Sequence, residues 1–307
     1  MPLVSSQELL EAAREGHYAV GAFNADNMEM LQAIVEVAEE ERAPVIVQVS
    51  EPTIQYAGLS LPAGMVRIAA AEARVPVVLH LDHGTGLEQN VHALREGFTS
   101  LMFDGSRLPY DENVAVTQSV VRMAHAAGIP VEAELGRVLN NGASPREVAE
   151  AMTDPGQAAD FVDRTGCDSL AVAAGSIHAM TSSLAELDLE RVRTISRRVA
   201  VPLVLHGSSG VTDASVLGAI AAGVCKVNVA TYLKQAFVES LRAAMAAQPD
   251  EVDFRRLFAP AREAVKERLR EKMRLFGASG RANGSSPFWS APGHSLRRSA
   301  VVEGGLD

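Results

Sequence analysis

The stretch Val75-Pro-Val-Val-Leu-His-Leu-Asp-His-Gly84 combines a structural signal with a chemical one. Its first half is apolar and rich in β-branched residues, which is typical of a buried strand. The apolar run stops at His80, Asp82 and His83, side chains that can bind metals or transfer protons. This pattern predicts a strand that carries an active site at its carboxyl end.

Short apolar runs like this one recur along the chain, and helical patterns separate them. Eight strands are predicted, at residues 19–23, 44–49, 76–81, 99–103, 129–133, 169–173, 202–205 and 225–229. Between them apolar residues recur with a period of 3.6, as at Met28, Leu31 and Ile34. Eight such units indicate an α/β fold, a (β/α)8 TIM barrel. The alternative, an open doubly wound sheet, usually has a glycine-rich phosphate turn after its first strand, and residues 21–25 lack one.

The region after the eighth strand predicts extra C-terminal helices at residues 231–247 and 261–276. They would cover the barrel or bury surface in an oligomer. We expect residues 1–282 to form a single barrel domain and residues 283–307, rich in Gly, Ser and Pro, to be a disordered tail. The segment 136–153 is the longest gap without a strand or strong helix pattern, so it is a candidate lid.

Composition restricts the partners. The chain has 307 residues and a net charge of −10, and no cluster of Lys and Arg stands out in its barrel-like part, which argues against nucleic acid or an acidic membrane as a partner. Only Cys167 and Cys225 occur, each in an apolar segment, so a disulfide framework is not expected. Without a signal sequence or a long apolar span, the protein is expected to be cytoplasmic.

Polar residues follow every predicted strand, at the end where TIM barrels place their active sites. They are Asn24, Ser50, Asp82 with His83, Asp104, Glu134, His178, His206 and Asn228. Three of the eight histidines are among them, and Glu134 lies near. Three imidazoles with an open position are the ligand set of a catalytic zinc. The pattern therefore predicts a metal site, although any single His is more often structural.

Asp82 precedes His83 directly and has two interpretations. It can exchange a proton with a metal-bound substrate, or it can orient an imidazole. His80, two residues earlier, is expected to support the site without binding the metal. Both interpretations of Asp82 stay open on the residues alone.

A second polar region is formed by residues 204–213 and 226–231. Glycines allow close approach of the backbone, and the seventh and eighth turns of these barrels often bind phosphate. His206-Gly-Ser-Ser-Gly210 is thus a candidate phosphate cradle, against the alternative of an ordinary glycine turn before a helix capped near Thr212. Thr85 and Gly105-Ser106 are weaker candidates.

Together these segments resemble the class II, zinc-dependent ketose-bisphosphate aldolases, which include the fructose- and tagatose-1,6-bisphosphate enzymes. The resemblance covers about residues 5–282. It is carried by Ala22-Phe-Asn-Ala-Asp-Asn-Met-Glu-Met30, His80-Leu-Asp-His-Gly84, Gly97-Phe-Thr-Ser100, Val131-Glu-Ala-Glu-Leu-Gly136, His206-Gly-Ser-Ser-Gly210, Asn228-Val-Ala-Thr231 and Leu275-Phe-Gly277. Ala230 is similar to the tagatose-type branch, because fructose-type enzymes often have an acid there.

The resemblance implies a lyase that cleaves a phosphorylated ketose between C3 and C4 into glycerone phosphate and an aldehyde. It implies Zn²⁺ on His83, His178 and His206, with Glu134 as an alternate ligand, and allows a monovalent cation near the phosphate. Asp82 matches the acid that moves the C4 hydroxyl proton. The implied substrate and phosphate contacts are Ser50, Gly207, Ser209, Asn228 and Thr231, and Asn24 supports the site with His80. The implied partner is a small sugar phosphate, and a homodimer or homotetramer is expected.

The chain departs from the family pattern at three places. Ala179 replaces a Gly after the second zinc histidine, so its methyl group would crowd the phosphate or cation site. The loop at residues 138–144 lacks the family's acid, for which Glu147 and Glu150 are the nearest replacements, and Tyr232 replaces a usual Glu. Two alternatives therefore remain: a metal-dependent barrel enzyme of another class, such as an isomerase or hydrolase, and a catalytically weak sugar-phosphate-binding relative.

Overall fold

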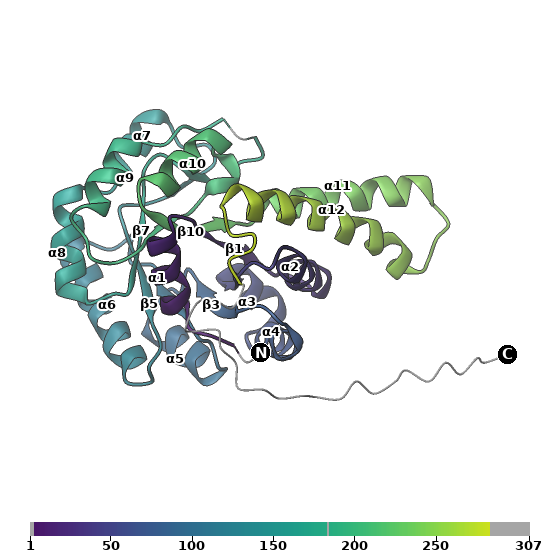
Figure 1. The fold of residues 1–307 in the computed structure, drawn as a ribbon, viewed down its shortest axis with the longest axis horizontal. Coiled ribbons are helices and arrows are strands. Elements are labelled where there is room, and N and C mark those ends of the chain that lie inside the picture. Colours follow the sequence, from purple (N-terminus) through teal and green to yellow (C-terminus); the bar gives the residue numbers. More distant parts are fainter. Residues whose placement is uncertain (1–2, 183, 283–307) are drawn as a thin grey trace.

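The computed structural model describes residues 3–182 and 184–282, and these form a (β/α)8 barrel (Figure 1). The barrel strands are β1 (Val20–Asn24), β2 (Val45–Ser50), β3 (Val77–Asp82), β4 (Leu101–Phe103), β5 (Val131–Leu135), β7 (Ser169–Val172), β9 (Leu203–Leu205) and β10 (Val224–Val229). They pair in parallel in the order β3-β2-β1-β10-β9-β7-β5-β4. The two edges meet through a bridge between His80 and Ser100, which closes the barrel. All eight predicted strands and the predicted fold class are confirmed.

Helices surround the strands. They are α1 (Ser6–Gly16), α2 (Met28–Glu41), α3 (Glu51–Ala57), α4 (Ser60–Glu72), α5 (Leu87–Arg95), α6 (Tyr110–His125), α7 (Pro145–Ala151), α8 (Pro155–Thr165), α9 (Leu189–Ser196), α10 (Asp213–Ala221), α11 (Thr231–Ala247) and α12 (Phe254–Leu275), with a short 3₁₀ turn η1 (Ser208–Gly210). Helix α2 shows why they form: the Asn27 side chain caps its amino end, and Leu31 and Ile34 are buried on the face toward the strands.

Alternation along the strands separates two environments. Odd-numbered residues of β3, such as Leu79 and Leu81, pack in the layer between strands and helices. Even-numbered residues point into the barrel, where His80, Glu132 and Lys226 are buried with a small apolar layer of Met102, Ala171 and Val204. The interior of this barrel is therefore unusually polar below the strand ends.

The candidate lid is more ordered than its sequence pattern predicts. Residues 136–153 contain a short strand, β6 (Leu139–Asn140), and helix α7. The amino end of α7 is a capping box: the Ser144 side chain accepts from Glu147 N, and the Glu147 side chain accepts from Ser144 N, with Pro145 at the first position. These local signals favour a helix even though the segment has no apolar stripe.

The C-terminal helices α11 and α12 project from the barrel as an antiparallel arm (Figure 1). Helix α11 has the predicted bounds, whereas α12 begins at Phe254 and not at Ala261, because Asp253 caps it and the helix runs through Pro260. The predicted tail at residues 283–307 lies outside the described residues.

Both cysteines are buried and unpaired. Burial raises the pKa of the Cys167 thiol to about 12 and that of Cys225 to about 11, so neither forms an appreciable thiolate at neutral pH. Among the described helices, none combines the length and apolar character that a membrane span requires.

Candidate functional site

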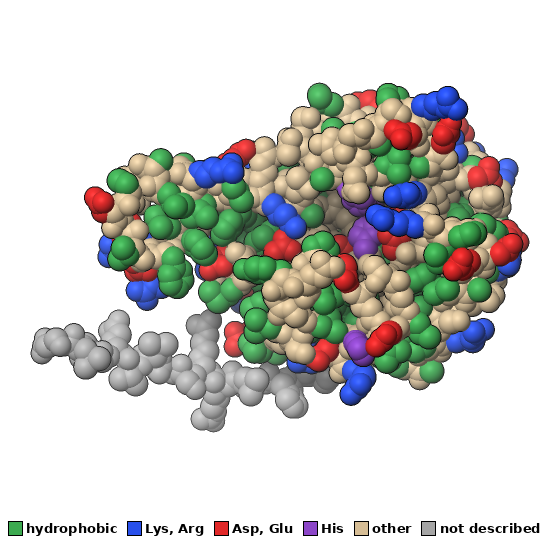
Figure 2. All heavy atoms as spheres, turned by 180° about the vertical axis from the view of Figure 1, so that it is seen from behind, with side chains coloured by type: hydrophobic (Ala, Val, Ile, Leu, Met, Phe, Trp, Pro, Cys, Tyr) green, Lys and Arg blue, Asp and Glu red, His purple; other side chains and the backbone are tan. Residues whose placement is uncertain are grey.

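Two adjoining cavities open at the carboxyl ends of the strands. The larger has a volume of about 690 Å³ and the smaller about 270 Å³, and both are lined by Pro52, His83 and His178. Figure 2 shows this face as a hollow in which His side chains are visible, with Lys or Arg side chains beside them. The histidines thus lie where the two cavities meet.

His83 occupies the turn that follows β3. Its backbone is in the left-handed region, with φ of 55°, which is uncommon for a residue with a side chain. Gly84 permits the turn, since a Cβ there would lie 2.3 Å from the Met102 carbonyl oxygen. The turn aims the imidazole over the barrel mouth.

The three predicted zinc histidines converge. One ring nitrogen from each of His83, His178 and His206 lies within 4.8 Å of the others. His83 Nε2 and His206 Nδ1 are 2.9 Å apart. His178 comes from β8 (Ile177–His178), a short strand beyond β7, and not from the end of the sixth barrel strand itself.

The strand β8 ties His178 to the loop after β5. It pairs in parallel with β6, Leu139 opposite Ile177 and Asn140 opposite His178, and Asn141 N donates to the His178 carbonyl oxygen at 3.0 Å. The backbone of one converging histidine is therefore held by the candidate lid.

The protonation of the histidines suits a divalent metal ion. Burial lowers the pKa of His178 to about 4 and that of His206 well below its usual value, so both imidazoles are neutral, the form that binds metals. Burial alone would also lower the pKa of His83, but Asp82 and the hydrogen bond to Asp104 outweigh it and raise the pKa to about 10. A cation at this point would take the place of that proton. The three histidines therefore fit the predicted metal.

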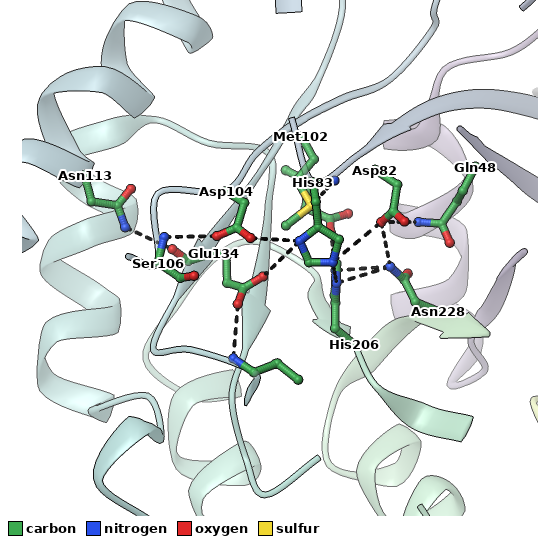
Figure 3. Close-up of polar contacts among 12 residues, drawn as sticks. Gln48, Asp82, His83, Met102, Asp104, Ser106, Asn113, Glu134, His206 and Asn228 are labelled. Atoms are coloured by element: carbon green, nitrogen blue, oxygen red, sulfur yellow. Dashed lines mark hydrogen bonds and ion pairs between the residues drawn. The ribbon is translucent and has the colours of Figure 1, made fainter. Parts of the chain in front are cut away.

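Asp104 and Glu134 lie on the other side of the His83 ring (Figure 3). His83 Nδ1 is 2.8 Å from Asp104 Oδ2 and 3.8 Å from Glu134 Oε2. Within the described chain Glu134 Oε2 is buried without a hydrogen-bond partner, and burial, with Asp104 nearby, raises the pKa of Glu134 to about 8. At neutral pH this side chain is therefore mainly a neutral carboxyl, and a cation beside it would favour the ionised form, in which this oxygen can act as a ligand.

Asp82 is held by amides from three strands. Its Oδ1 accepts from Gln48 at 2.9 Å and from Asn228 at 3.2 Å, and its Oδ2 accepts from Asn24 at 2.9 Å. Burial raises the pKa of Asp82, but the positive charge of His83 and the Asn24 hydrogen bond more than compensate, so the net shift is downward. The carboxylate is therefore ionised and lies 4.0 Å from His83 Nε2. It can accept a proton beside the converging histidines.

The smaller cavity gathers the predicted substrate contacts. Its lining includes Ser50, Gly207, Ser209, Asn228 and Thr231. Gly207 has φ of 66°, and a Cβ there would lie 2.9 Å from the Ile177 carbonyl carbon, so the close approach of the turn to β8 requires glycine. The cavity also lies against the amino end of α11, where Thr231 and Lys234 line it and the helix dipole favours anions. The predicted phosphate contacts thus share one cavity.

His80 and the weaker candidates lie around this centre. His80 is fully buried inside the barrel, with its Nδ1 2.7 Å from Ser100 Oγ, away from the three converging nitrogens. Thr85 and Ser106 line the larger cavity, whereas Gly105 is packed against Asn113.

The three departures have distinct structural outcomes. Ala179 lines the smaller cavity with φ of 59°, so its methyl group borders the predicted phosphate contacts. Glu147 is exposed and caps α7, and Glu150 pairs with Arg146, and neither lines either of the two cavities described above. Tyr232 turns toward α12, where its hydroxyl donates to Glu271 at 2.9 Å.

Several residues of the site were not predicted. Gln48, two residues before the end of β2, contacts Asp82, and two-residue alternation from Ser50 was the signal that could have found it. Lys234 lines the smaller cavity one turn after Thr231. Arg107 and Arg137 line the larger one from the loops after β4 and β5, and no sequence signal separates them from other exposed arginines.

Comparisons with known proteins show what the chain is similar to. The family model described as fructose-bisphosphate aldolase class-II matches residues 4–281. A Bacillus subtilis protein named "Probable fructose-bisphosphate aldolase" is 43% identical over 92% of this chain and 100% of its own length. A fructose-bisphosphate aldolase of Thermus caldophilus is 42% identical over 91% of this chain and all of its own. The crystal structure of the YdjI aldolase from Escherichia coli superposes with a TM-score of 0.79 and 38% identity, covering 92% of this chain and 100% of that one.

Proposed function

The chain belongs to the class-II fructose-bisphosphate aldolase family, and from this premise we propose that it is a zinc-dependent enzyme cleaving fructose-1,6-bisphosphate or tagatose-1,6-bisphosphate. The products are glycerone phosphate and an aldehyde, formed by retro-aldol cleavage of the C3–C4 bond. The observation that carries the proposal is the ionised Asp82 carboxylate 4.0 Å from His83 Nε2, at the point where three histidines converge.

Each residue then has a defined task. Zn²⁺ held by His83, His178 and His206 would polarise the substrate ketone as a Lewis acid. Asp82 accepts the proton of the C4 hydroxyl, the C3–C4 bond breaks, and its electron pair remains on C3 of the glycerone phosphate half as an enediolate. The C4 half leaves as the aldehyde. Asn228 donates to Asp82, and its Oδ1, buried without a partner in the described chain, is free to accept from a substrate hydroxyl.

The enediolate must regain a proton at C3. Glu147 and Glu150, the nearest loop acids, do not line either cavity. We propose that a water molecule in the larger cavity donates this proton, since that cavity is open to solvent and lined by polar groups. The chain would then release glycerone phosphate without a dedicated loop acid.

The two cavities correspond to the two ends of the substrate. In the smaller cavity, Ser50, Gly207, Ser209 and Thr231 would bind the phosphate of the glycerone half. In the larger one, the guanidinium groups of Arg107 and Arg137 have no hydrogen-bond or ion-pair partner within the described chain, although the protein is acidic overall. We propose that they bind the anionic end of the aldehyde half, since guanidinium groups bind phosphates with two hydrogen bonds.

The arm formed by α11 and α12 supports a homo-oligomer, a homodimer or homotetramer. Val252 is 93% exposed and Phe254 61% exposed at the tip of the arm, and Met245 is 53% exposed nearby. Figure 2 shows apolar side chains gathered along this projection, which would be covered in an assembly of identical chains. We also propose a cytoplasmic location, which the two unpaired buried cysteines support.

A coupled assay tests the function. The purified protein, with its zinc content measured, is given a panel of ketose 1,6-bisphosphates and 1-phosphates, and glycerone phosphate is detected by its enzymatic reduction. We expect turnover of a bisphosphate, its loss on chelation and its return with Zn²⁺. Full zinc occupancy without release of glycerone phosphate from any ketose would contradict the proposal. It would favour the alternatives, which are an isomerase or hydrolase and a catalytically weak sugar-phosphate-binding relative.

A further inference from the structure

A chain of buried polar contacts runs from the proposed metal centre into the barrel. His206 Nε2 lies 2.8 Å from Glu132 Oε1, and Lys226 Nζ lies 2.8 Å from Glu132 Oε2. Lys226 Nζ is also 3.4 Å from His80 Nε2. Glu132 is 2% exposed and Lys226 1% exposed. The proposed reaction uses neither of these two charges.

The pair is an unusual element of the fold. Glu132 lies on β5 and Lys226 on β10, two strands that are separated in the sheet by β7 and β9, so the contact crosses the barrel interior. Taking two charges out of water is costly, and a buried ion pair often contributes little net stability compared with apolar residues. Packing alone therefore does not explain the presence of this pair.

The chemistry of the pair determines which atom donates in the hydrogen bond between His206 and Glu132. The Lys226 ammonium can only donate, and the Glu132 carboxylate, which it neutralises, can only accept. His206 Nε2 must therefore carry a hydrogen, which it donates to Glu132. The lone pair of a neutral His206 is then on Nδ1, the atom 2.9 Å from His83 Nε2.

We propose that Glu132 and Lys226 form a positioning pair that fixes His206 in the tautomer and orientation needed to bind the metal through Nδ1. Carboxylates commonly orient metal-binding histidines in this way. Lys226 allows Glu132 to do so inside the barrel, because the pair carries no net charge. The inference rests on the metal centre of the proposed function.

Four variants separate this role from a merely structural one. Glu132→Gln keeps the shape but offers His206 either an oxygen or an N–H, so the tautomer is no longer imposed. Lys226→Met leaves the Glu132 carboxylate buried alone, which is expected to destabilise the fold. The double variant Glu132→Gln/Lys226→Met removes both charges and relieves that cost. Ser100→Ala is the control, since Ser100 lies beyond His80 and does not contact Glu132.

The measurements are Co²⁺ affinity, by competition with a chromophoric chelator, the visible spectrum of the Co²⁺-loaded chains, and urea unfolding of the same samples. We expect Co²⁺ affinity to fall about 10- to 100-fold in Glu132→Gln and to stay low in the double variant. The urea unfolding midpoint of the double variant should nevertheless recover from the low value of Lys226→Met toward the wild-type value. The Co²⁺ spectrum should change in both. Ser100→Ala should keep its affinity within about two-fold.

Two results would overturn the inference in distinguishable ways. If the wild-type chain binds Co²⁺ and the double variant binds it equally well with the same spectrum, the pair is structural only. If the wild-type chain binds neither Co²⁺ nor Zn²⁺, the metal centre of the proposed function fails, and the positioning role fails with it.

Discussion

Asp82 and Glu147 are both acids near the barrel mouth, but they are held in opposite ways. Asp82 is buried and accepts hydrogen bonds from amides on three different strands. Glu147 is exposed, and hydrogen bonds to Ser144, three residues away, lower its pKa. The position of the first is a property of the whole barrel, whereas that of the second is a property of one helix turn. Only Asp82 is therefore held in a fixed position relative to the converging histidines.

The largest effect is expected at the strand-held acid. Asp82→Ala should retain the metal and lower kcat on the order of 10³-fold, because it removes the base but none of the three histidines. Metal content and glycerone phosphate release would be measured together. Loss of zinc with the activity would instead mean that Asp82 orients a ligand.

A smaller effect is expected at the cavity arginines, which lie in loops. Arg107→Leu and Arg137→Leu should each raise KM for a bisphosphate about 10-fold, since each removes a charge-assisted hydrogen bond. A ketose 1-phosphate with an uncharged tail serves as the comparison substrate and should be unaffected. Arg122→Leu, on the outer helix α6, is the control. Equal losses on both substrates would remove the arginines from the binding of the distal anion.

A modest change is expected at Ala179, in the loop after β8. An L-residue with φ of 59° is strained, and glycine is not. Ala179→Gly should therefore increase the free energy of unfolding by about 1 kcal/mol. It should also tighten competitive inhibition by inorganic phosphate, since the methyl group leaves the cavity. Urea unfolding and inhibition assays measure the two effects separately, and weaker phosphate binding would contradict the crowding.

The smallest effect on turnover is expected at the helix cap. Glu147→Gln should leave kcat and the exchange of the C3 proton of glycerone phosphate with deuterated water within about two-fold, because the side chain faces Ser144 and not a cavity. A large loss of exchange would show that the loop acid reaches the substrate after all, and would end the contrast with Asp82.

Residues at strand ends could be predicted because the fold itself places them. Once eight parallel strands are recognised, their carboxyl ends must share one face, so Asp82, His83 and His206 had to lie near one another. Stepping back two residues from Ser50, Glu134 and Asn228 would also have placed Gln48, Glu132 and Lys226 inside the barrel. The polar residues inside the barrel could thus have been predicted from the sequence.

Other features depend on contacts that no local pattern contains. His178 lies on β8, whose two residues pair with a loop far away in sequence. The proposed tautomer of His206 depends on the ion pair between Glu132 and Lys226, which spans the barrel interior. Arg107 and Arg137 share a cavity only because two loops border it. In each case the determining partner is distant in sequence.

The pairing of β6 with β8 gives the enzyme a mechanical link. Each strand contributes only two residues, so the ladder is short, yet it joins the backbone of the loop after β5 to that of His178. A movement of this loop is therefore expected to shift His178, one of the three histidines proposed to hold the metal. If a sugar phosphate displaces the loop when it binds, the visible spectrum of a cobalt-loaded protein should change with it.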